Sequence, residues 1–307
     1  MKRTKSGVGS LPGFRGTWRA LGLLVSCHFS SCAIYPLHVA TLEGDVEGVA
    51  RLLDEGERVE SRNRDGLVPL HLAALTGQMP MIELLVKNGA RVDQVTPDGS
   101  TALHLSASTG NRAVAEALIQ LGAEIDVVNT RGVSPLLFAV QGGHDEVAEL
   151  LIAHGADVNV QTKLGYTSLC IVEDVDLAAR LIDHGARVDH EMDSGTMDSP
   201  LHLASFWGRR AIVELLVSLG ADIDRVNGQG ETPLDLAEIG DEPTIVSYLS
   251  SLGARRTLAP AEVERRKELV VDATSMLGRK GRPVMESRRI VDPVGEETRL
   301  RFVVGYE

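Results

Sequence analysis

Hydrophobic residues are grouped in short segments, and residues 68–100 show a pattern that recurs along the chain. The segment VPLHLAA (68–74) is almost wholly apolar and carries a proline at its start, which the first turn of a helix tolerates. After a polar break, MIELLVKNG (81–89) has apolar residues at helical spacing and a terminating glycine. Short alternation with Asp-Gly follows in ARVDQVTPDGS (90–100), as in a tight hairpin turn. The pattern predicts helix, turn, helix and hairpin.

This unit occurs seven times. The apolar openings align on leucines at intervals of 33 residues, with one interval of 32: Leu37, Leu70, Leu103, Leu136, Leu169, Leu201 and Leu234. A glycine follows the second segment of each unit: Gly56, Gly89, Gly122, Gly155, Gly185, Gly220 and Gly253. Two short helices cannot enclose a core by themselves, so each unit has to bury its apolar face against its neighbours. We therefore expect an all-α repeat solenoid.

The period and the motifs PLHLAA, LL and NGARVD resemble the ankyrin repeat over about residues 35–256. The resemblance implies a non-catalytic scaffold that binds a protein partner through a concave groove. It also implies that the groove is lined by the pair of residues at the end of each first helix and by the hairpin tips. Matched to those positions, the candidate partner-binding residues are Phe206, Trp207, Leu75, Thr76, Arg64, Lys163, Tyr166 and Arg131.

Phe206 and Trp207 stand out among these positions because the chain has only five Phe and two Trp. Large rigid rings bury much area at little entropic cost, so the pair is a candidate binding hot spot. The alternative is that Trp207 packs back onto a neighbouring unit.

The fifth unit is shorter between its helices than the others. Leu169 and Gly185 are 16 residues apart where the other units have 19, and the link from Gly185 to Leu201 is 16 where the others are 14. The longer loop HEMDSGTMDS (190–199) precedes Phe206 and Trp207. This irregularity reflects either sequence drift in one repeat or a bend of the array that has a function.

The charge of the chain changes the expected partner. The formal net charge is −12, while residues 1–34 carry five basic residues and no acid. Residues 257–307 are nearly balanced, so the negative charge belongs to the repeats. An acidic body disfavours nucleic acid as the main partner and would attract a basic protein. The blander interpretation is that the charge serves solubility.

No catalytic motif or metal-binding motif accompanies the repeats. A phosphate-binding glycine loop, a GxSxG elbow and an HExxH motif are all missing from the sequence, and we expect no cofactor. His184, His190 and Glu191 are close enough to be considered as metal ligands, but a polar hairpin explains them better. Other histidines recur at the repeat period, and the resemblance implies that they tie hairpin to helix structurally: His71, His104 and His202.

The first 34 residues have a basic start followed by ALGLLVSC (20–27). They resemble a secretory signal, and Cys27 falls where a bacterial lipoprotein is lipidated. A disordered tail or a mis-assigned start are the alternatives. The localisation is accordingly open between an exported or membrane-anchored protein and a cytoplasmic one.

After the repeats, residues 259–277 have the pattern of an amphipathic helix that caps the last unit. Residues 278–289 are basic and punctuated by Gly and Pro, which indicates a flexible linker. Residues 298–307 alternate like a strand that folds back on the array, pairs with a partner or stays disordered. A rival hypothesis assigns an effector or enzyme-like activity to this tail, with the repeats only targeting it.

Overall fold

The computed structural model describes residues 35–192, 198–276, 283–291 and 297–305. The chain divides into two compact units, one comprising residues 32–267 and the other residues 1–31 with 268–307.

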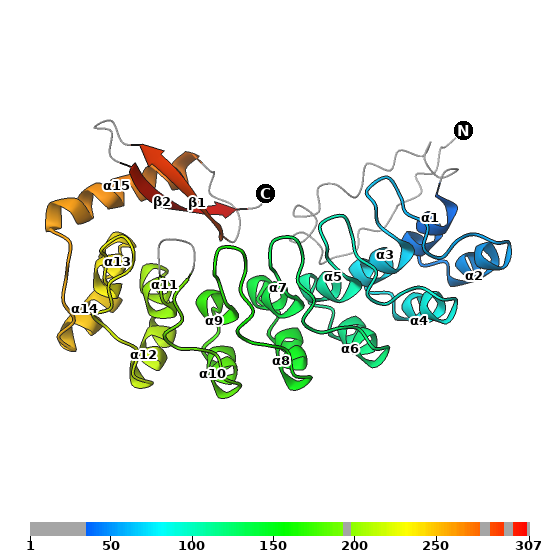
Figure 1. Cartoon of the computed structure of the whole chain (residues 1–307), viewed down its shortest axis with the longest axis horizontal. Helices are drawn as coiled ribbons and strands as arrows, with labels where there is room; N and C mark the ends of the chain where they lie inside the picture. The colour runs from blue at the N-terminus through cyan, green and yellow to red at the C-terminus, as the bar shows by residue number, and fades with distance from the viewer. Residues whose placement is uncertain (1–34, 193–197, 277–282, 292–296, 306–307) are drawn as a thin grey trace, which may run out of the picture. The chain divides into compact units, whose positions relative to one another are not determined.

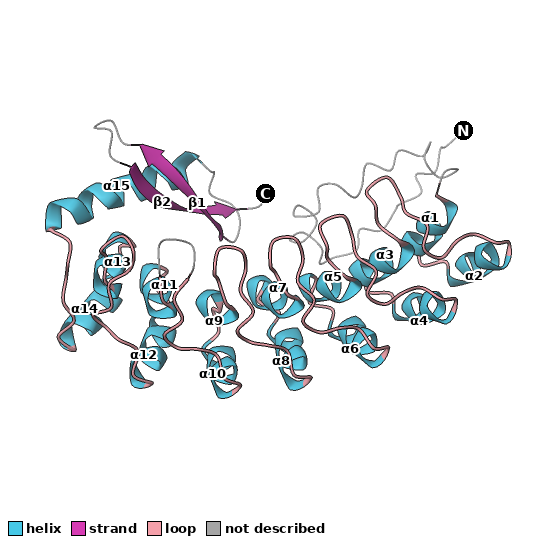
Figure 2. Ribbon diagram, in the orientation of Figure 1, coloured by secondary structure: helices cyan, strands magenta, loops and turns pink. Residues whose placement is uncertain are grey.

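The larger unit is an all-α array of seven helix pairs, as the pattern predicts (Figure 1). The first helices of the pairs are α1 (Pro36–Glu43), α3 (Pro69–Thr76), α5 (Ala102–Ser108), α7 (Pro135–Gly142), α9 (Ser168–Ile171), α11 (Pro200–Phe206) and α13 (Pro233–Ile239). The second helices are α2 (Val46–Asp54), α4 (Met79–Lys87), α6 (Arg112–Gln120), α8 (Asp145–Ala153), α10 (Val175–Asp183), α12 (Arg210–Ser218) and α14 (Pro243–Ser251). The first helices, α1 to α13, pack side by side in an inner row, and the second helices, α2 to α14, pack in an outer row (Figure 2).

Local signals explain where the helices begin and end. In the fourth pair, the Ser134 hydroxyl accepts a hydrogen bond from the Leu137 amide at 3.3 Å and Pro135 occupies the first turn, so both features favour a helix start there. The helix ends at Gly143, whose φ of 65° lies in the left-handed region that glycine adopts without strain.

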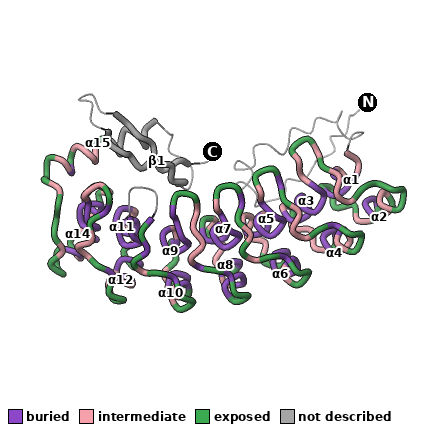
Figure 3. The backbone as a smooth tube through the Cα atoms, viewed as in Figure 1, coloured by how far each residue is buried: buried purple, intermediate pink, exposed green. Residues whose placement is uncertain are grey.

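The core lies between the two rows and continues through all seven pairs (Figure 3). The aligned leucines are its common element, and each is at most 2% exposed: Leu37, Leu70, Leu103, Leu136, Leu169, Leu201 and Leu234. Each pair therefore buries its apolar face against its neighbours, which is the physical reason that the pairs form an array.

Among the described residues, the hairpins between pairs are tight turns and contain no β-strand (Figure 2). At the first one, the Asn63 amide donates to the Leu67 carbonyl at 2.9 Å and the Gly66 amide to the Asn63 carbonyl at 3.0 Å. The Asn63 side-chain oxygen accepts from the Leu67 amide at 2.9 Å, which closes the turn a third time.

The fifth pair departs from the others in its first helix. Its helix α9 has four residues, whereas the other first helices have seven or eight. The residues missing from this unit are thus the last turn of the inner helix. The outer helix α10 keeps the common nine residues.

The C-terminal segment contains helix α15 (Pro260–Met276), strand β1 (Pro283–Val291) and strand β2 (Glu297–Gly305). The strands pair antiparallel, with Pro283 opposite Gly305 and Val291 opposite Glu297. The expected linker at 278–289 is wrong over residues 283–289, because this stretch provides the edge on which the predicted C-terminal strand pairs. In the described part of the chain, no helix is long and apolar enough to cross a membrane.

Candidate functional site

The inner face comprises the exposed surface of the seven first helices, α1 to α13, together with the hairpin tips. Helices α3, α5, α7, α9 and α11 contain no Asp, Glu, Lys or Arg. Every outer helix from α2 to α12, in contrast, carries at least one acidic residue. The helices that form the wall of the inner face are therefore uncharged over five consecutive repeats, whereas the outer helices carry acidic side chains.

The predicted binding residues fall into two groups by exposure. Arg64, Thr76, Arg131 and Lys163 are exposed on the inner face, with Leu75 half-buried beside Thr76. These side chains occupy the helix end of the second repeat and three hairpin tips. They are available to a partner without any change in the fold.

Phe206 and Tyr166 are buried, being 8% and 9% exposed respectively. Phe206 is therefore a weaker candidate for partner binding than the sequence indicates, since its ring packs inside the array and offers little area to a partner. The neighbouring backbone is also tightly packed: a Cβ placed on Gly240 would lie 2.2 Å from the Phe206 carbonyl oxygen. The last two inner helices can approach this closely because residue 240 has no side chain.

Trp207 is half-buried and packs against Arg209. The Arg209 guanidinium lies 4.3 Å from the centroid of the indole ring, within the range of a cation–π interaction. The Trp207 Nε1 atom is buried and has no hydrogen-bond partner among the described residues. Much of the indole ring therefore packs within the array, which supports the alternative that Trp207 packs onto a neighbouring unit. The exposed edge of the ring is still accessible to a partner.

Arg209 connects the sixth repeat to the shortened fifth one. Its Nη1 atom donates to the Cys170 carbonyl at 3.3 Å, and its Nη2 lies 3.9 Å from the Glu173 carboxylate. Burial lowers the pKa of Arg209 to about 10, with Glu173 opposing the shift. The guanidinium remains charged at neutral pH and caps the carbonyl end of α9, where cations are favourable.

Sequence reasoning missed Arg209, although a periodic signal marks it. The residue eight positions after the aligned leucine reaches back to a first-helix carbonyl of the preceding repeat at two other places. Gln78 Nε2 donates to the Leu42 carbonyl at 3.3 Å, and His144 Nε2 to the Ser108 carbonyl at 3.1 Å. The carbonyl that Arg209 meets comes earlier in its unit because α9 lacks the last turn. The longer arginine side chain occurs at the position where the carbonyl to be reached is farther away.

Where the recurring histidine is present, it joins the first helix to the following hairpin. His104 Nδ1 accepts from the Thr101 amide at 3.0 Å, so its Nε2 carries the proton and donates to the Val133 carbonyl at 3.1 Å. His71 makes the same connection from Val68 to Gln94, and His202 from Ser199 to Glu231. Burial lowers the pKa of both His71 and His104 to about 4, so both are neutral at pH 7.

Asp235 stands at this position in the last repeat, where no hairpin follows. It accepts hydrogen bonds from the Thr232 amide at 2.9 Å and from the Thr257 amide at 3.1 Å. Burial would raise the pKa of Asp235, but these bonds outweigh it and hold the pKa below its ordinary value. The Asp235 carboxylate therefore accepts hydrogen bonds from the segment that follows the last repeat, whereas the histidines donate hydrogen bonds to carbonyl groups.

The middle hairpin tips are joined to one another through their backbones. The Thr130 amide donates to the Asp98 carbonyl at 2.8 Å, and the Lys163 amide to the Arg131 carbonyl at 2.9 Å. A Cβ on Gly132 would lie 2.9 Å from the Gln161 carbonyl oxygen, so glycine permits this contact. The three tips therefore form a continuous platform.

The histidines considered as metal ligands have other partners. His184 bonds to the Arg180 carbonyl at 2.9 Å, and His190 Nε2 to the Gly165 carbonyl at 3.0 Å. Glu191 forms an ion pair with Arg225. Within the described part of the chain, no three or more His, Cys, Asp or Glu side chains are grouped as a metal would require. Cys27 and the predicted leader lie outside the described residues.

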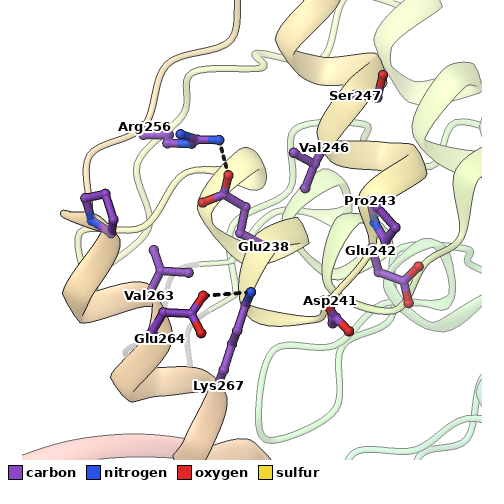
Figure 4. Close-up of a pocket in the computed structure, with 11 residues that line it drawn as sticks. Glu238, Asp241, Glu242, Pro243, Val246, Ser247, Arg256, Val263, Glu264 and Lys267 are labelled. Carbon is purple, nitrogen blue, oxygen red and sulfur yellow. Dashed lines mark hydrogen bonds and ion pairs between the residues drawn. The ribbon is translucent and has the colours of Figure 1, made fainter.

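A pocket of about 460 Å³ lies at the C-terminal end of the array, and none of the predicted binding residues lines it (Figure 4). It is lined by Glu238, Asp241, Glu242, Pro243, Val246, Ser247, Arg256, Pro260, Val263, Glu264 and Lys267. Lys267 pairs with Glu264 at 3.0 Å, and Arg256 pairs with Glu238. Both basic side chains of the pocket are therefore paired with acidic residues of the same pocket.

Stacked helix pairs with an uncharged inner wall and projecting hairpins define the class of repeat scaffolds. Comparison with known proteins identifies the family, because the pattern described as "Ankyrin repeats (3 copies)" matches residues 37–129, 91–162, 121–191, 136–227 and 169–258. These matches span most of the chain, and the protein belongs to the ankyrin repeat family. No curated protein matches the chain.

Two solved structures give the scale of the similarity. The ankyrin repeat domain of Bcl-3, described as a unique member of the IkappaB family, is 31% identical with a TM-score of 0.60. The match covers 69% of this chain and 97% of that one. The human ASB11 ankyrin repeat domain is 32% identical with a TM-score of 0.57, and the match covers 66% of this chain and 91% of that one.

The comparisons identify only ankyrin repeats, which typically bind proteins and are typically not catalytic. They identify no catalytic domain and lend no support to the predicted lipoprotein leader. Cys27 and the localisation stay predictions.

Proposed function

We propose that the protein is a scaffold that binds another protein through its inner face. The observation that carries the proposal is the contrast between constant and variable positions. The aligned leucines are buried in every repeat, while the helix ends and hairpin tips differ from repeat to repeat and include the exposed Thr76, Gln141 and Lys163. Variable exposed positions on a rigid frame are what a specific binding surface requires.

Trp207 would contact the partner only through the exposed edge of its ring. The exposed residues of the second to fourth repeats would make most of the contacts. The negative charge of the repeats is not carried by these inner helices, so it gives no reason to expect a basic partner at the wall that they form. Acidic side chains recur through the outer row, whereas five consecutive inner helices have none.

The test compares two double variants that add the same charge on opposite rows. Thr76→Arg with Gln141→Arg places two large cations on the inner face, and Gln120→Arg with Ser218→Arg places them on exposed outer positions. Proteins captured from cells by the tagged full chain are quantified by mass spectrometry. We expect the specific partner to be lost from the inner variant and retained by the outer one.

The reverse pattern, with loss only in the outer variant, would exclude the inner face as the binding surface. Circular dichroism and thermal unfolding of both variants serve as the folding control, since all four positions lie outside the core.

A further inference from the structure

Three basic residues project from the hairpin tips without an ionic partner. Arg64, Arg131 and Lys163 are exposed, and within the described residues none of them has an ion pair. Arg62 differs from them, since its guanidinium donates to the Val95 carbonyl at 3.0 Å and to the Gly66 carbonyl. Arg62 is therefore part of the frame, while the other three side chains are exposed. Burial would raise the pKa of Asp98 on the neighbouring tip, but hydrogen bonds and the charge of Arg131 lower it.

Two of the three charges are held on a rigid base. The Lys163 amide bonds to the Arg131 carbonyl, and the next tip is joined through Thr130 and Asp98. The Arg131 guanidinium also lies 5.8 Å from the centroid of the Phe138 ring on α7. The backbone positions of both residues are thus fixed, and the Arg131 guanidinium is restrained as well, so it loses less entropy when it binds an anion.

The tips also carry apolar groups between the charges. Val128 is 48% exposed and Leu164 is 36% exposed, and they belong to the same hairpins as Arg131 and Lys163. Asp98 is the acidic residue of the intervening tip, but it accepts hydrogen bonds from the Thr96 and Ser100 hydroxyls. Asp65, next to Arg64, is a second exposed acidic residue of the tips. Over the four tips, four basic residues (Arg62, Arg64, Arg131 and Lys163) face two acidic ones (Asp65 and Asp98), so the net character of this row is basic and apolar.

We propose that these tips bind an extended acidic segment of the partner protein, with aspartate or glutamate side chains paired to Lys163, Arg131 and Arg64. This inference rests on the proposed function and specifies the chemistry of the partner. The uncharged wall of α3, α5, α7, α9 and α11 places no acidic residue behind the tips to repel such a segment.

The repeat spacing sets the spacing of the acidic residues. Packed helices are roughly 8–10 Å apart, and an extended chain advances about 3.3 Å per residue, so one repeat corresponds to about three residues of ligand. Arg131 is one repeat from Lys163, and Arg64 is two repeats further along. The complementary segment therefore has acidic residues at positions 1, 4 and 10.

The acidic outer helices do not prevent this association at physiological salt. Charges separated by more than about 8 Å of solution are largely screened at that ionic strength. The outer row lies behind the inner row, so the nearby tips contribute more to the potential that a bound segment experiences. The net charge of the chain consequently gives the wrong sign for the partner of this surface.

The test measures fluorescence polarisation of a labelled ten-residue peptide with glutamate at positions 1, 4 and 10 in a serine and valine background. Matched peptides carry glutamine, lysine or phosphoserine at those positions, and a ten-nucleotide single-stranded DNA serves as a general polyanion. The full chain is compared with Arg64→Gln/Arg131→Gln/Lys163→Gln and with Arg51→Gln/Lys87→Gln/Arg91→Gln, which removes three exposed charges away from the tips.

We expect the glutamate peptide to bind the full chain, to lose about tenfold in affinity with the tip variant and to be unaffected by the matched variant. Equal losses in both variants, equal binding of the glutamine or lysine peptide, or equal binding of the DNA would overturn the proposal. Binding confined to the phosphoserine peptide would overturn the assignment to unmodified carboxylates.

The outcome is separable from that of the proposed function. If the glutamate peptide fails while partner capture still depends on Thr76 and Gln141, the inner face binds a partner of different chemistry. If the glutamate peptide does not bind and partner capture does not depend on Thr76 and Gln141, while the protein is folded, the scaffold proposal itself is wrong.

Discussion

The third and fifth repeats share a period and a core leucine but differ in how they finish the inner helix. Helix α5 has seven residues, and His104 connects it to the next hairpin through the Val133 carbonyl. Helix α9 has four residues, and the corresponding side chain is Cys170, whose sulfur lies 3.4 Å from the Thr167 hydroxyl. In the fifth repeat, Arg209 from the next unit supplies a connection to the carbonyl end of the helix.

This difference shows that the array depends on satisfied backbone groups more than on a fixed helix length. A helix that ends early leaves carbonyl groups to be bonded elsewhere, and a long cationic side chain reaches them. Trp207 then covers the guanidinium. The most unusual aromatic residue of the repeats is thus connected with the most unusual repeat.

The largest expected effect compares the two core leucines. Leu103→Ala should destabilise the array by about 4 kcal/mol and Leu169→Ala by about 2 kcal/mol, because a site beside a one-turn helix can collapse around the cavity more readily. Urea unfolding followed by circular dichroism measures both. Equal losses would mean that the fifth repeat is packed as rigidly as the third.

Acid should destabilise the histidine-connected repeats. Because the folded pKa of His104 is about 4 and lies below the ordinary value of 6.5, the unfolded chain takes up the proton first as the pH falls. The stabilisation is fully present above about pH 6.5 and is lost progressively down to about pH 4, by up to about 3 kcal/mol for each such histidine.

His104→Leu provides the control for this pH dependence, since Leu137 occupies the same position in the fourth repeat. The variant should be less stable at pH 7.5, because the Val133 carbonyl loses its donor, but its stability should fall less between pH 6.5 and 4.5. A pH profile identical to that of the unaltered chain would remove His104 as a source of acid sensitivity.

The next effect concerns the residue that reaches back to the preceding repeat. Arg209→Ala should cost about 2 kcal/mol, since it removes a charged hydrogen bond and the contact with Trp207. Gln78→Ala, at the equivalent position beside a full-length helix, should cost about 0.5 kcal/mol. Thermal and urea unfolding would distinguish them, and similar small losses would mean that the short helix needs no cap.

The smallest expected effect is that of Trp207→Phe. A phenyl ring retains a face for the Arg209 guanidinium and removes the unpartnered indole N–H, so stability should change by less than about 1 kcal/mol. Trp207→Ala is the contrasting variant and should be clearly less stable. Equal stability of all three proteins, measured by urea unfolding, would show that the ring contributes nothing to the array.

The frame was predictable because it is encoded locally and repeated. Apolar residues on one face and a glycine after the second helix indicate the same elements seven times, and proline starts five of the seven first helices, so an error in one unit is corrected by the others. The recurrence of histidine at the repeat period likewise reflects a local requirement, since His104 bonds within three residues of itself and to the next hairpin.

The candidate site was harder to predict because exposure depends on neighbouring repeats. Phe206 and Trp207 occupy sequence positions that are available in other units, yet one is buried and the other covers Arg209. Residues 283–289 appeared to be a linker by composition, but β1 includes them because β2 offers a pairing edge. Neither outcome follows from the residues of one segment alone.

The sequence by itself determined the period, the helix pairs, the core leucines and the family, because these follow from local propensity and from apolar spacing that is copied along the chain. Only the tertiary structure decided which aromatic rings remain open and which carbonyls Arg209 bonds. It also decided that Arg64, Arg131 and Lys163 project from one row of tips while acidic residues recur through the outer helices. Net charge is a sum over the chain, whereas binding depends on where each charge lies, and that position is set by packing between repeats.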